Sequence, residues 1–259
     1  MSQLTLAKRI DRMLAATGVR FGGCRFPYFH RLGTAPIAHP LTGTSEYHTE
    51  AQFEAFIKWF ATSYVSISPD QWVAFHQLES APPSNAAILS FDDGYADNFE
   101  LAEPILQRYD VQATFFIAAS IVGTPGGMSV SQVRDLHALG HTIGAHTNTH
   151  KPLAKLPAPA AREELLTARK TLEDMVGAPC FHMSYPYGSC NDSIADLVAE
   201  AGYKTAFTTE EFGNQRHTDL MRLGRTKIWP TDMDEAAFSV RMRGVHEWRN
   251  LLKPANSDA

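Results

Sequence analysis

Between residues 86 and 209 the chain alternates short, mainly apolar runs with longer segments that are apolar on one side. The short runs are rich in β-branched and aromatic residues, which favours buried strands. They cover residues 86–91, 113–120, 141–147, 180–186 and 204–209. The segments between them have apolar residues at helical spacing. They cover residues 101–109, 129–140, 159–176 and 193–202. This alternation predicts an α/β fold with a parallel sheet, either doubly wound or closed as a barrel.

The first 84 residues have a different pattern. Residues 22–50 are rich in Gly, Pro, Thr and His, so we expect mostly loop with one short strand. Residues 51–64 have an apolar helical stripe, and residues 4–14 have the spacing of a short amphipathic helix docked on the domain, with a membrane-surface anchor as the alternative. A Pro-Pro-Ser-Asn turn then precedes the alternating region. We therefore expect an N-terminal extension, residues 1–84, packed on one main domain formed by residues 85–259.

The composition narrows the class of protein. Hydrophobic residues make up 44% and charged residues 20%, as in ordinary soluble proteins. A net charge of −5 argues against broad binding to nucleic acid or anionic lipid. No apolar run approaches the roughly 18 residues of a transmembrane helix, and no secretory signal is visible. The three cysteines lack CxxC spacing, so we expect free thiols and a cytoplasmic protein.

Polar residues that could bind a ligand or take part in a reaction occur where the predicted strands end. Asp92 and Asp93 follow the first strand, His146 ends the third, and Tyr185-Pro186-Tyr187 ends the fourth. Ligands of parallel α/β folds bind at such strand ends, so these residues are expected to share one site. Adjacent aspartates point in different directions, so one can bind a metal while the other faces a substrate. An Asp-Asp-Gly turn whose side chains cap backbone N–H groups is the alternative.

The segment HTNTH adds a pair of potential metal ligands. His146 and His150 are four residues apart, which on a helical turn brings both imidazoles to one face. Two histidines and one carboxylate form a common zinc-type ligand set with open positions for water and substrate. Other first-row divalent metals suit the same ligands, so the choice of metal stays open.

The segments FDDGY, HTNTH and SYPYG, in this order and spacing, resemble the first three motifs of the NodB-type polysaccharide deacetylases, carbohydrate esterase family four. The upstream FPYFHR resembles the Tyr-His-Arg entry segment of some members. The resemblance covers roughly residues 87–230. It implies a distorted (β/α) barrel of about seven strands with a metal-dependent N-deacetylase site.

The resemblance also implies a role for each motif residue. Asp93, His146 and His150 would bind a divalent metal, most simply Zn²⁺, and Asp92 would be the general base. The backbone N–H of Tyr187 would help to hold the oxyanion of the reaction, and Pro186 would fix the turn that aims this donor.

The chain departs from the family pattern at several positions. Many members have an arginine at the position of Ser184, where it orients the catalytic aspartate. We take Arg225 as the replacement, with an ordinary surface arginine as the alternative. The fourth, Asp-Trp motif and the late Leu-x-His that supplies the general acid are not visible. His30, His246 and His217 are therefore candidates for the acid, unless Asp92 itself shuttles the proton.

The leading hypothesis is a metal-dependent hydrolase that removes the N-acetyl group from an amino sugar in a glycan or glycan precursor. Hydrolysis of another C–N bond, in a formamide or a cyclic amide, is a second reading, because the fold does not select the substrate. A non-catalytic glycan-binding relic is the third; retention of Asp92 argues against it. Without a visible export signal we favour a soluble precursor, such as a nucleotide-linked or lipid-linked amino sugar.

Overall fold

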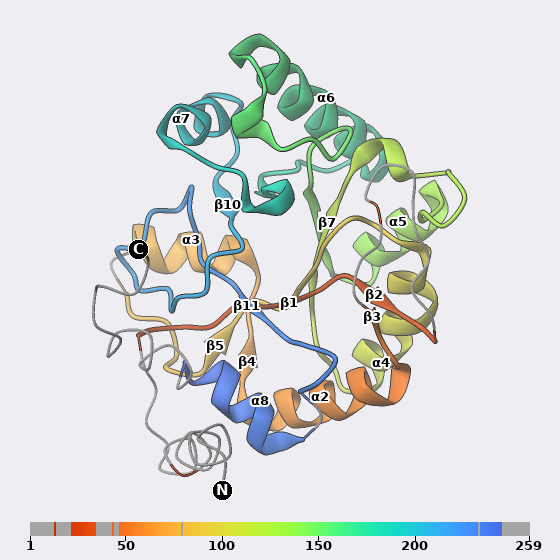
Figure 1. The fold of residues 1–259 in the computed structure, drawn as a ribbon, viewed down its shortest axis with the longest axis vertical. Coiled ribbons are helices and arrows are strands. Elements are labelled where there is room, and N and C mark those ends of the chain that lie inside the picture. The colour runs from red at the N-terminus through yellow and green to blue at the C-terminus, as the bar shows by residue number, and fades with distance from the viewer. Residues whose placement is uncertain are drawn as a thin grey trace, which may run out of the picture.

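The computed structural model describes residues 22–34, 47–78, 80–232 and 234–244, together with Met13 and Gly43. Seven short parallel strands form one curved sheet (Figure 1). In spatial order they are β10 (Thr205–Phe207), β9 (His182–Ser184), β8 (Thr142–Ala145), β7 (Thr114–Ile117), β6 (Ser90–Phe91), β1 (Pro27–Phe29) and β11 (Thr226–Lys227). The expected distorted (β/α) barrel of about seven strands is confirmed.

The segment around β11 links the two edges of the sheet. Thr226 pairs with Pro27 of β1, while Leu223 forms a parallel bridge to Phe207 of β10. The N–H of Thr208 also donates to the carbonyl oxygen of Leu223 over 2.8 Å. Because the segment that carries β11, one edge strand, also contacts β10, the other edge strand, β10 and β1 are brought round the same axis, and residues on these strands can face a common site.

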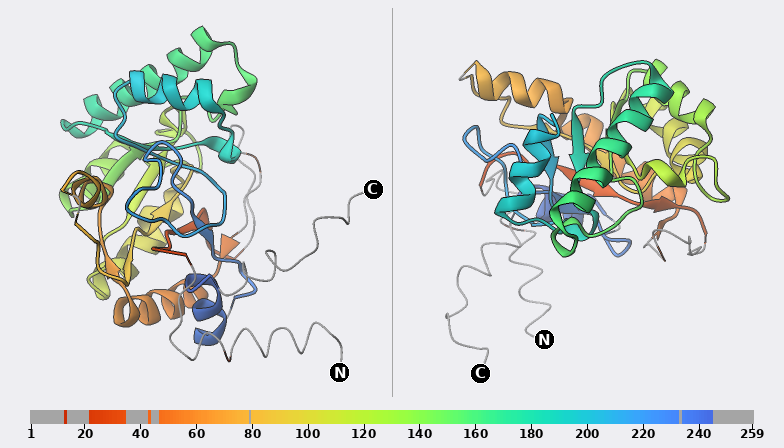
Figure 2. Two further views of the ribbon diagram at one scale, coloured as in Figure 1. Left: turned by 90° about the vertical axis from the view of Figure 1, so that its left-hand side faces the viewer. Right: turned by 90° about the horizontal axis from the view of Figure 1, so that it is seen from above.

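Helices surround the sheet, with α2 and α8 together at one side and α6 and α7 at the opposite side (Figure 2). The α-helices are α2 (Glu50–Ser63), α3 (Pro69–Gln77), α4 (Glu103–Arg108), α5 (Val130–Ala138), α6 (Ala158–Val176), α7 (Asp192–Glu200) and α8 (Glu235–Met242). The shorter elements are β2 (Arg31–Leu32), β3 (Tyr47–His48), β4 (Val65–Ser66), β5 (Ala86–Ala87), η1 (Asn98–Ala102), η2 (Ala119–Ile121), η3 (Leu153–Lys155) and η4 (Pro186–Gly188). Within the described part of the chain, every helix is too short or too polar to span a bilayer.

Helix ends follow local signals in the sequence. Thr49 and Ser129 begin α2 and α5 with capping boxes, in which the hydroxyl and the side chain of Gln52 or Gln132 satisfy N–H groups of the first turn. Gly177 ends α6 with a φ of 70°, a conformation that glycine adopts without strain. The predicted helices at 51–64, 129–140, 159–176 and 193–202 are confirmed. The helix expected at residues 4–14 lies, Met13 apart, outside the described residues.

Two predicted elements are interrupted. The apolar run 86–91 forms two strands rather than one, because β5 pairs with β4 whereas β6 pairs with β1 and β7. The segment 101–109 enters its helix through the π-helical turn η1 before α4 begins. The run 86–91 is divided by a change of tertiary partner, which local periodicity does not encode. In the second segment Pro104, which has no N–H to donate, lies in the first turn of α4.

Neighbouring residues of the strands supply two separate cores. Phe29, Phe91 and Phe115 belong to the large core, which also contains buried side chains of α2, α5 and α6. Phe116 belongs instead to a smaller cluster on the opposite face, where Trp72 of α3 packs edge-to-face on Phe26 at 5.0 Å. The large core fills the space between the sheet and the helices α2, α5 and α6, whereas the smaller cluster includes Phe26 and Phe116 of the sheet region and Trp72 of α3.

Residues before position 85 contribute a strand to the barrel itself. Tyr28 and Phe29 of β1 pair with Ser90 and Phe91 of β6, so β1 lies inside the seven-stranded sheet. A division at residue 84 therefore separates β1 from its neighbours. Three residues are too few for a recognisable alternation, and the sequence pattern alone favoured a loop over most of residues 22–50.

Buried His141 makes the stability of the fold sensitive to acid. Its Nδ1 accepts a hydrogen bond from the N–H of Ala113 over 3.2 Å, and burial lowers the pKa of the imidazole to about 4. The folded state therefore favours the neutral ring, whereas the unfolded chain binds a proton below about pH 6.5. Stability contributed by neutral His141 is complete above pH 6.5 and is lost as the pH falls towards 4.

The variant His141→Asn keeps an acceptor for the Ala113 N–H. We expect it to reduce the change in the free energy of unfolding between pH 6.5 and 4 by about 3 kcal/mol. Denaturant unfolding of the metal-free protein at several pH values measures it. His137→Asn, at an exposed position of α5, the helix that precedes His141, is the control and should leave the pH profile unchanged. Parallel profiles for wild type and His141→Asn would contradict the assignment.

Candidate active site

The residues expected to share one site lie in loops that directly extend strands of the sheet. The N–H of Asp92 donates to the carbonyl oxygen of Phe29 over 3.0 Å, and the N–H of His146 donates to that of Ile117 over 2.8 Å. Tyr185 donates in the same way to Phe207 over 2.9 Å. The backbone hydrogen bonds of the sheet therefore continue into the loops and fix the positions of Asp92, His146 and Tyr185.

Asp93, His146 and His150 form a compact cluster of buried side chains. The Nε2 atoms of His146 and His150 lie 3.4 Å and 3.2 Å from Oδ1 of Asp93. One potential ligand atom from each residue lies within 4.8 Å of the other two. Among the described residues, this is the group of three whose spacing can hold a metal ion.

The chemistry of these three donors fits a divalent metal. Burial lowers the pKa of His146 to about 4, so its ring is neutral at physiological pH. Nδ1 of His146 lies 2.9 Å from the carbonyl oxygen of Ser184; because that oxygen can only accept, Nδ1 carries the proton and Nε2 presents its lone pair towards Asp93. Burial opposes ionisation of Asp93, but a hydrogen bond from His150 and the nearby imidazoles outweigh it and lower the pKa of the carboxyl. Neutral imidazoles and an ionised carboxylate are what a Zn²⁺-type site requires.

The backbone around this cluster is strained. Five described residues other than glycine have a positive φ, and the fifth, Asp110, follows α4. The other four lie here: Asp93, Thr147, His150 and Tyr187, with φ values of 77°, 60°, 57° and 59°. Side chains at positive φ cost free energy and persist where the surrounding structure holds them. Gly94, with a φ of 95°, allows the turn after the aspartates: a Cβ there would lie 2.7 Å from the side chain of Ile117. Strain concentrated on two of the three potential ligands is typical of a functional site.

Asp92 lies beside the cluster and forms a buried ion pair with Arg225. Nη1 and Nη2 of Arg225 donate to the two carboxylate oxygens of Asp92 over 2.7 Å and 2.6 Å. Arg225 is fully buried; its Nε donates to the carbonyl oxygen of Thr208, and its guanidinium lies 4.2 Å from the ring centre of Tyr28. Burial alone would raise the pKa of Asp92, but Arg225 and then His146 outweigh it and lower the pKa of this carboxyl. Asp92 is therefore a carboxylate of fixed orientation, and Arg225 contacts it rather than solvent.

Ser184 connects Asp92 to the histidine cluster. Its hydroxyl donates to Oδ1 of Asp92 over 3.1 Å and lies 2.6 Å from Nδ1 of His146. From the sequence this residue was only a departure from an arginine-containing motif. Ser184 ends β9, directly before Tyr185 and Pro186, and this strand-end position is the sequence signal for its place in the site. Its partners depend on the assembled barrel.

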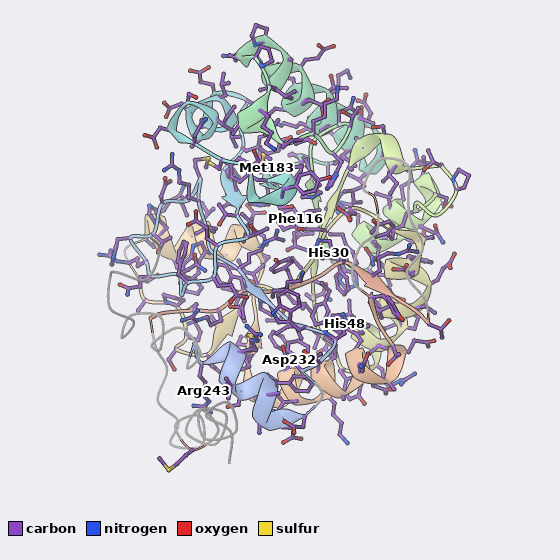
Figure 3. All side chains as sticks on the ribbon, in the orientation of Figure 1. His30, His48, Phe116, Met183, Asp232 and Arg243 are labelled. Carbon is purple, nitrogen blue, oxygen red and sulfur yellow. The ribbon has the colours of Figure 1, made fainter. Side chains whose placement is uncertain are left out.

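His30 lies next to the two aspartates. It follows Phe29, which pairs with Phe91, and its charge would lower the pKa of both Asp92 and Asp93. The carbonyl oxygen of His30 accepts a hydrogen bond from Asn98 over 2.7 Å, which fixes the backbone there. Figure 3 shows His30 over the central part of the sheet rather than at the periphery. The structure therefore brings His30 to the site.

Of the other two histidine candidates, His217 does not enter this group. His217 is exposed. The carbonyl oxygen of its neighbour Arg216 lies 2.6 Å from Nδ1 of His76 in α3. His246 lies outside the described residues.

Tyr187 forms the outer wall of the cluster. Its side chain is 65% exposed, and its ring centre lies 4.8 Å from that of His150. Pro186 is buried at the start of η4, and the N–H groups of Gly188 and Ser189 close the turn onto Tyr185 and Pro186. The turn presents an aromatic surface to solvent directly beside a candidate metal ligand.

Comparisons with known proteins agree with this geometry. The sequence profile "Polysaccharide deacetylase" matches residues 79–206. The putative polysaccharide deacetylase YxkH of Bacillus subtilis is 27% identical over 79% of this chain and 73% of its own length. The poly-beta-1,6-N-acetyl-D-glucosamine N-deacetylase of Staphylococcus aureus is 25% identical over 63% of this chain and 61% of its own length.

A solved structure shares the fold. The Streptococcus pyogenes deacetylase PplD, in complex with acetate, superposes with a TM-score of 0.76 at 20% sequence identity. The match covers 85% of this chain and 99% of that one. At this identity the likeness concerns the fold, and the site residues have to be argued from their own geometry.

Proposed function

Since this chain belongs to the NodB-type polysaccharide deacetylase family, we propose that it is a metal-dependent hydrolase that removes the N-acetyl group from an amino sugar in a glycan or glycan precursor. The observation that carries the proposal is the juxtaposition of an ionised, immobilised Asp92 with the cluster of Asp93, His146 and His150. A general base beside three metal donors has little use in a protein that only binds glycans.

Asp93, His146 and His150 would hold the metal, with Zn²⁺ the first candidate because two imidazoles and one carboxylate form a common zinc ligand set. When bound there, such an ion supplies Lewis-acid polarisation of the amide carbonyl and lowers the pKa of a water molecule.

Asp92 acts as the general base and accepts the proton of the attacking water. Arg225 binds both of its oxygens and Ser184 donates to one of them, so the carboxylate cannot turn away from the site. The backbone N–H of Tyr187, in the turn held by Pro186, contributes a hydrogen bond to the oxygen that gains negative charge.

His30 is the proton donor to the leaving amine. An amine leaves poorly without a proton, so a second titratable group has to stand within reach of the leaving nitrogen. Asn98 holds the backbone of His30, and the buried pair of Arg31 with Asp97, whose Nε–Oδ2 distance is 2.9 Å, holds the next residue. His30 is thus an imidazole on a fixed backbone at the carboxyl end of β1, next to the strand that carries Asp92.

We expect His30→Gln to lower acetate release from N-acetyl sugars by roughly 10²- to 10⁴-fold, the usual contribution of a general acid. Metal content should be unchanged, because His30 is not one of the three ligands. Hydrolysis of 4-nitrophenyl acetate, whose leaving group needs no proton, should fall much less. Equal losses on both substrates would remove His30 from this role, and exposed His137→Gln is the control.

The substrate class is an N-acetylated amino sugar. The S. aureus relative is named for poly-β-1,6-N-acetylglucosamine, which makes oligomers of this sugar the first substrates to test. A cytoplasmic location, which we also expect, would favour nucleotide-linked or lipid-linked precursors instead.

The test is a screen of Zn²⁺-loaded protein on N-acetylglucosamine oligomers, nucleotide-linked N-acetylhexosamines, formamides and cyclic amides. The proposal predicts acetate and free amine in equal amounts from one of the sugar substrates. Formate or a ring-opened acid as the sole product would show that the protein hydrolyses another C–N bond, in a formamide or a cyclic amide. Binding of sugar with no acetate released would identify a glycan-binding protein.

A further inference from the structure

The loop that carries His150 is tied to helix α6 by one buried carboxylate. The N–H of Thr149 donates to Oε2 of Glu164 over 2.7 Å, and the hydroxyl of Thr149 donates to Oε1. Glu164 is 7% exposed, on the side of α6 that faces the barrel. Lys151, more than half exposed, has its Nζ at 3.8 Å. Both oxygens of Glu164 are thus engaged by the residue that immediately precedes a proposed metal ligand.

Buried carboxylates are costly unless they are hydrogen-bonded. Glu163, the preceding residue, is exposed to solvent, as most glutamates are. Glu164 instead places its charge under the HTNTH loop and accepts two hydrogen bonds from a single residue there. Such charge-assisted bonds are short and directional, so the carboxylate constrains the loop as well as stabilising it.

The two histidines of the loop are oriented by different means. His146 is held through Nδ1, which contacts the carbonyl oxygen and the hydroxyl of Ser184. Buried Nδ1 of His150 has no hydrogen-bond partner among the described residues. Apart from the contact of Nε2 with Asp93 and the packing of the ring on Tyr187, the direction of the His150 ring therefore depends on its backbone, which is in the left-handed region with a φ of 57°.

The backbone of the loop is clamped from two sides. On one side the N–H groups of Ala119 and Ser120 donate to the carbonyl oxygens of Thr147 and Asn148 over 3.1 Å and 3.0 Å. On the other side Glu164 holds Thr149. Without Glu164 the first half of the loop keeps its partners, while the strained residue that follows Thr149 loses the contact that stabilises it.

We propose that Glu164 is a positioning residue of the metal site, which acts through Thr149 to keep the His150 imidazole facing Asp93. This inference rests on the proposed function only in taking Asp93, His146 and His150 as metal ligands. It does not depend on the substrate, the base or the acid.

The experiment measures Zn²⁺ affinity of the metal-free protein by competition with a chromophoric chelator, without any substrate. Glu164→Ala should raise the Zn²⁺ dissociation constant by about 10- to 100-fold, the usual effect of removing a group that supports a metal ligand. Thr149→Val, which removes the hydroxyl donor, should weaken binding less, and Thr149→Ser should bind as wild type does. Glu163→Ala is the matched control and should leave affinity unchanged.

The visible spectrum of the Co²⁺-loaded proteins is a second readout, which reports ligand geometry. Glu164→Ala should alter the ligand-field bands, whereas Glu163→Ala should not. Wild-type Zn²⁺ affinity and an unchanged Co²⁺ spectrum in Glu164→Ala would overturn the positioning role. If Glu164→Ala does not fold, the comparison of Thr149→Val with Thr149→Ser decides: equal affinities overturn the proposal. Failure of wild type to bind Zn²⁺ would overturn the metal site itself, whereas tight binding without acetate release would overturn only the proposed function.

Discussion

Asp92→Asn is expected to reduce acetate release by roughly 10²- to 10⁴-fold while the protein still binds one metal ion, because a carboxamide cannot accept the proton of the attacking water. Its side chain lies beside the metal cluster but is not one of its three donors. Hydrolysis of 4-nitrophenyl acetate should fall equally, since attack by water is common to both substrates. The measurements are acetate release and metal content of the same preparation.

The substitution also leaves the guanidinium of Arg225 buried without its counter-charge. Breaking a buried ion pair on one side destabilises a protein by about 3–5 kcal/mol. The double variant Asp92→Asn/Arg225→Met removes both charges and separates the effects: it should recover stability but not activity. Turnover of Asp92→Asn close to that of wild type would contradict the assignment of Asp92 as the base.

Arg225→Met should have the second largest effect, on both stability and the pH profile. It leaves the Asp92 carboxylate buried with no cation bonded to it, so we expect a loss of about 3–5 kcal/mol in the free energy of unfolding. With Arg225 present the pKa of Asp92 is lowered. The stability that this pair contributes is therefore complete above the unfolded pKa, near 3.9, and is lost as the pH falls through the lower folded value.

Without Arg225, burial dominates and raises the pKa of Asp92. The base is then protonated at a higher pH, so the acidic limb of the kcat/KM profile should move upward, and activity should partly return in alkaline buffer. Arg225→Lys keeps a charge but not the two parallel hydrogen bonds, so its acidic limb should lie between those of Arg225→Met and wild type. An unshifted acidic limb in Arg225→Met would contradict the role of this pair.

Local patterns in the sequence were sufficient for the elements that are defined locally. The nineteen residues of α6 have a continuous apolar stripe and a glycine stop, and α5 begins at the capping box of Ser129 and Gln132. The HTNTH spacing predicted that two imidazoles lie together, and the structure places their ring centres 5.0 Å apart. The expected helical turn is wrong, however, because residues 146–150 form an irregular loop with Thr147 and His150 at positive φ. Each of these features depends on residues within a few positions of one another.

Features that depend on closure of the barrel could not be derived in this way. Arg225 is 133 residues from Asp92, and they meet because β11 lies next to β1, which lies next to β6. With two residues in β11 and three in β1, neither strand has a detectable period. Arg225 was accessible to sequence reasoning through the family pattern, whereas the contacts of Ser184 and Glu164 depend on which strand and helix face the same loop.

Titration of the metal-free protein with Zn²⁺, with acetate release from N-acetylglucosamine oligomers followed at each step, tests the central claim most directly. The account predicts that acetate release rises in proportion to bound metal, stops rising at one equivalent per chain, and is absent at every step in His150→Ala. Acetate release that is independent of added and bound metal, or a wild-type protein that binds no metal, would contradict it.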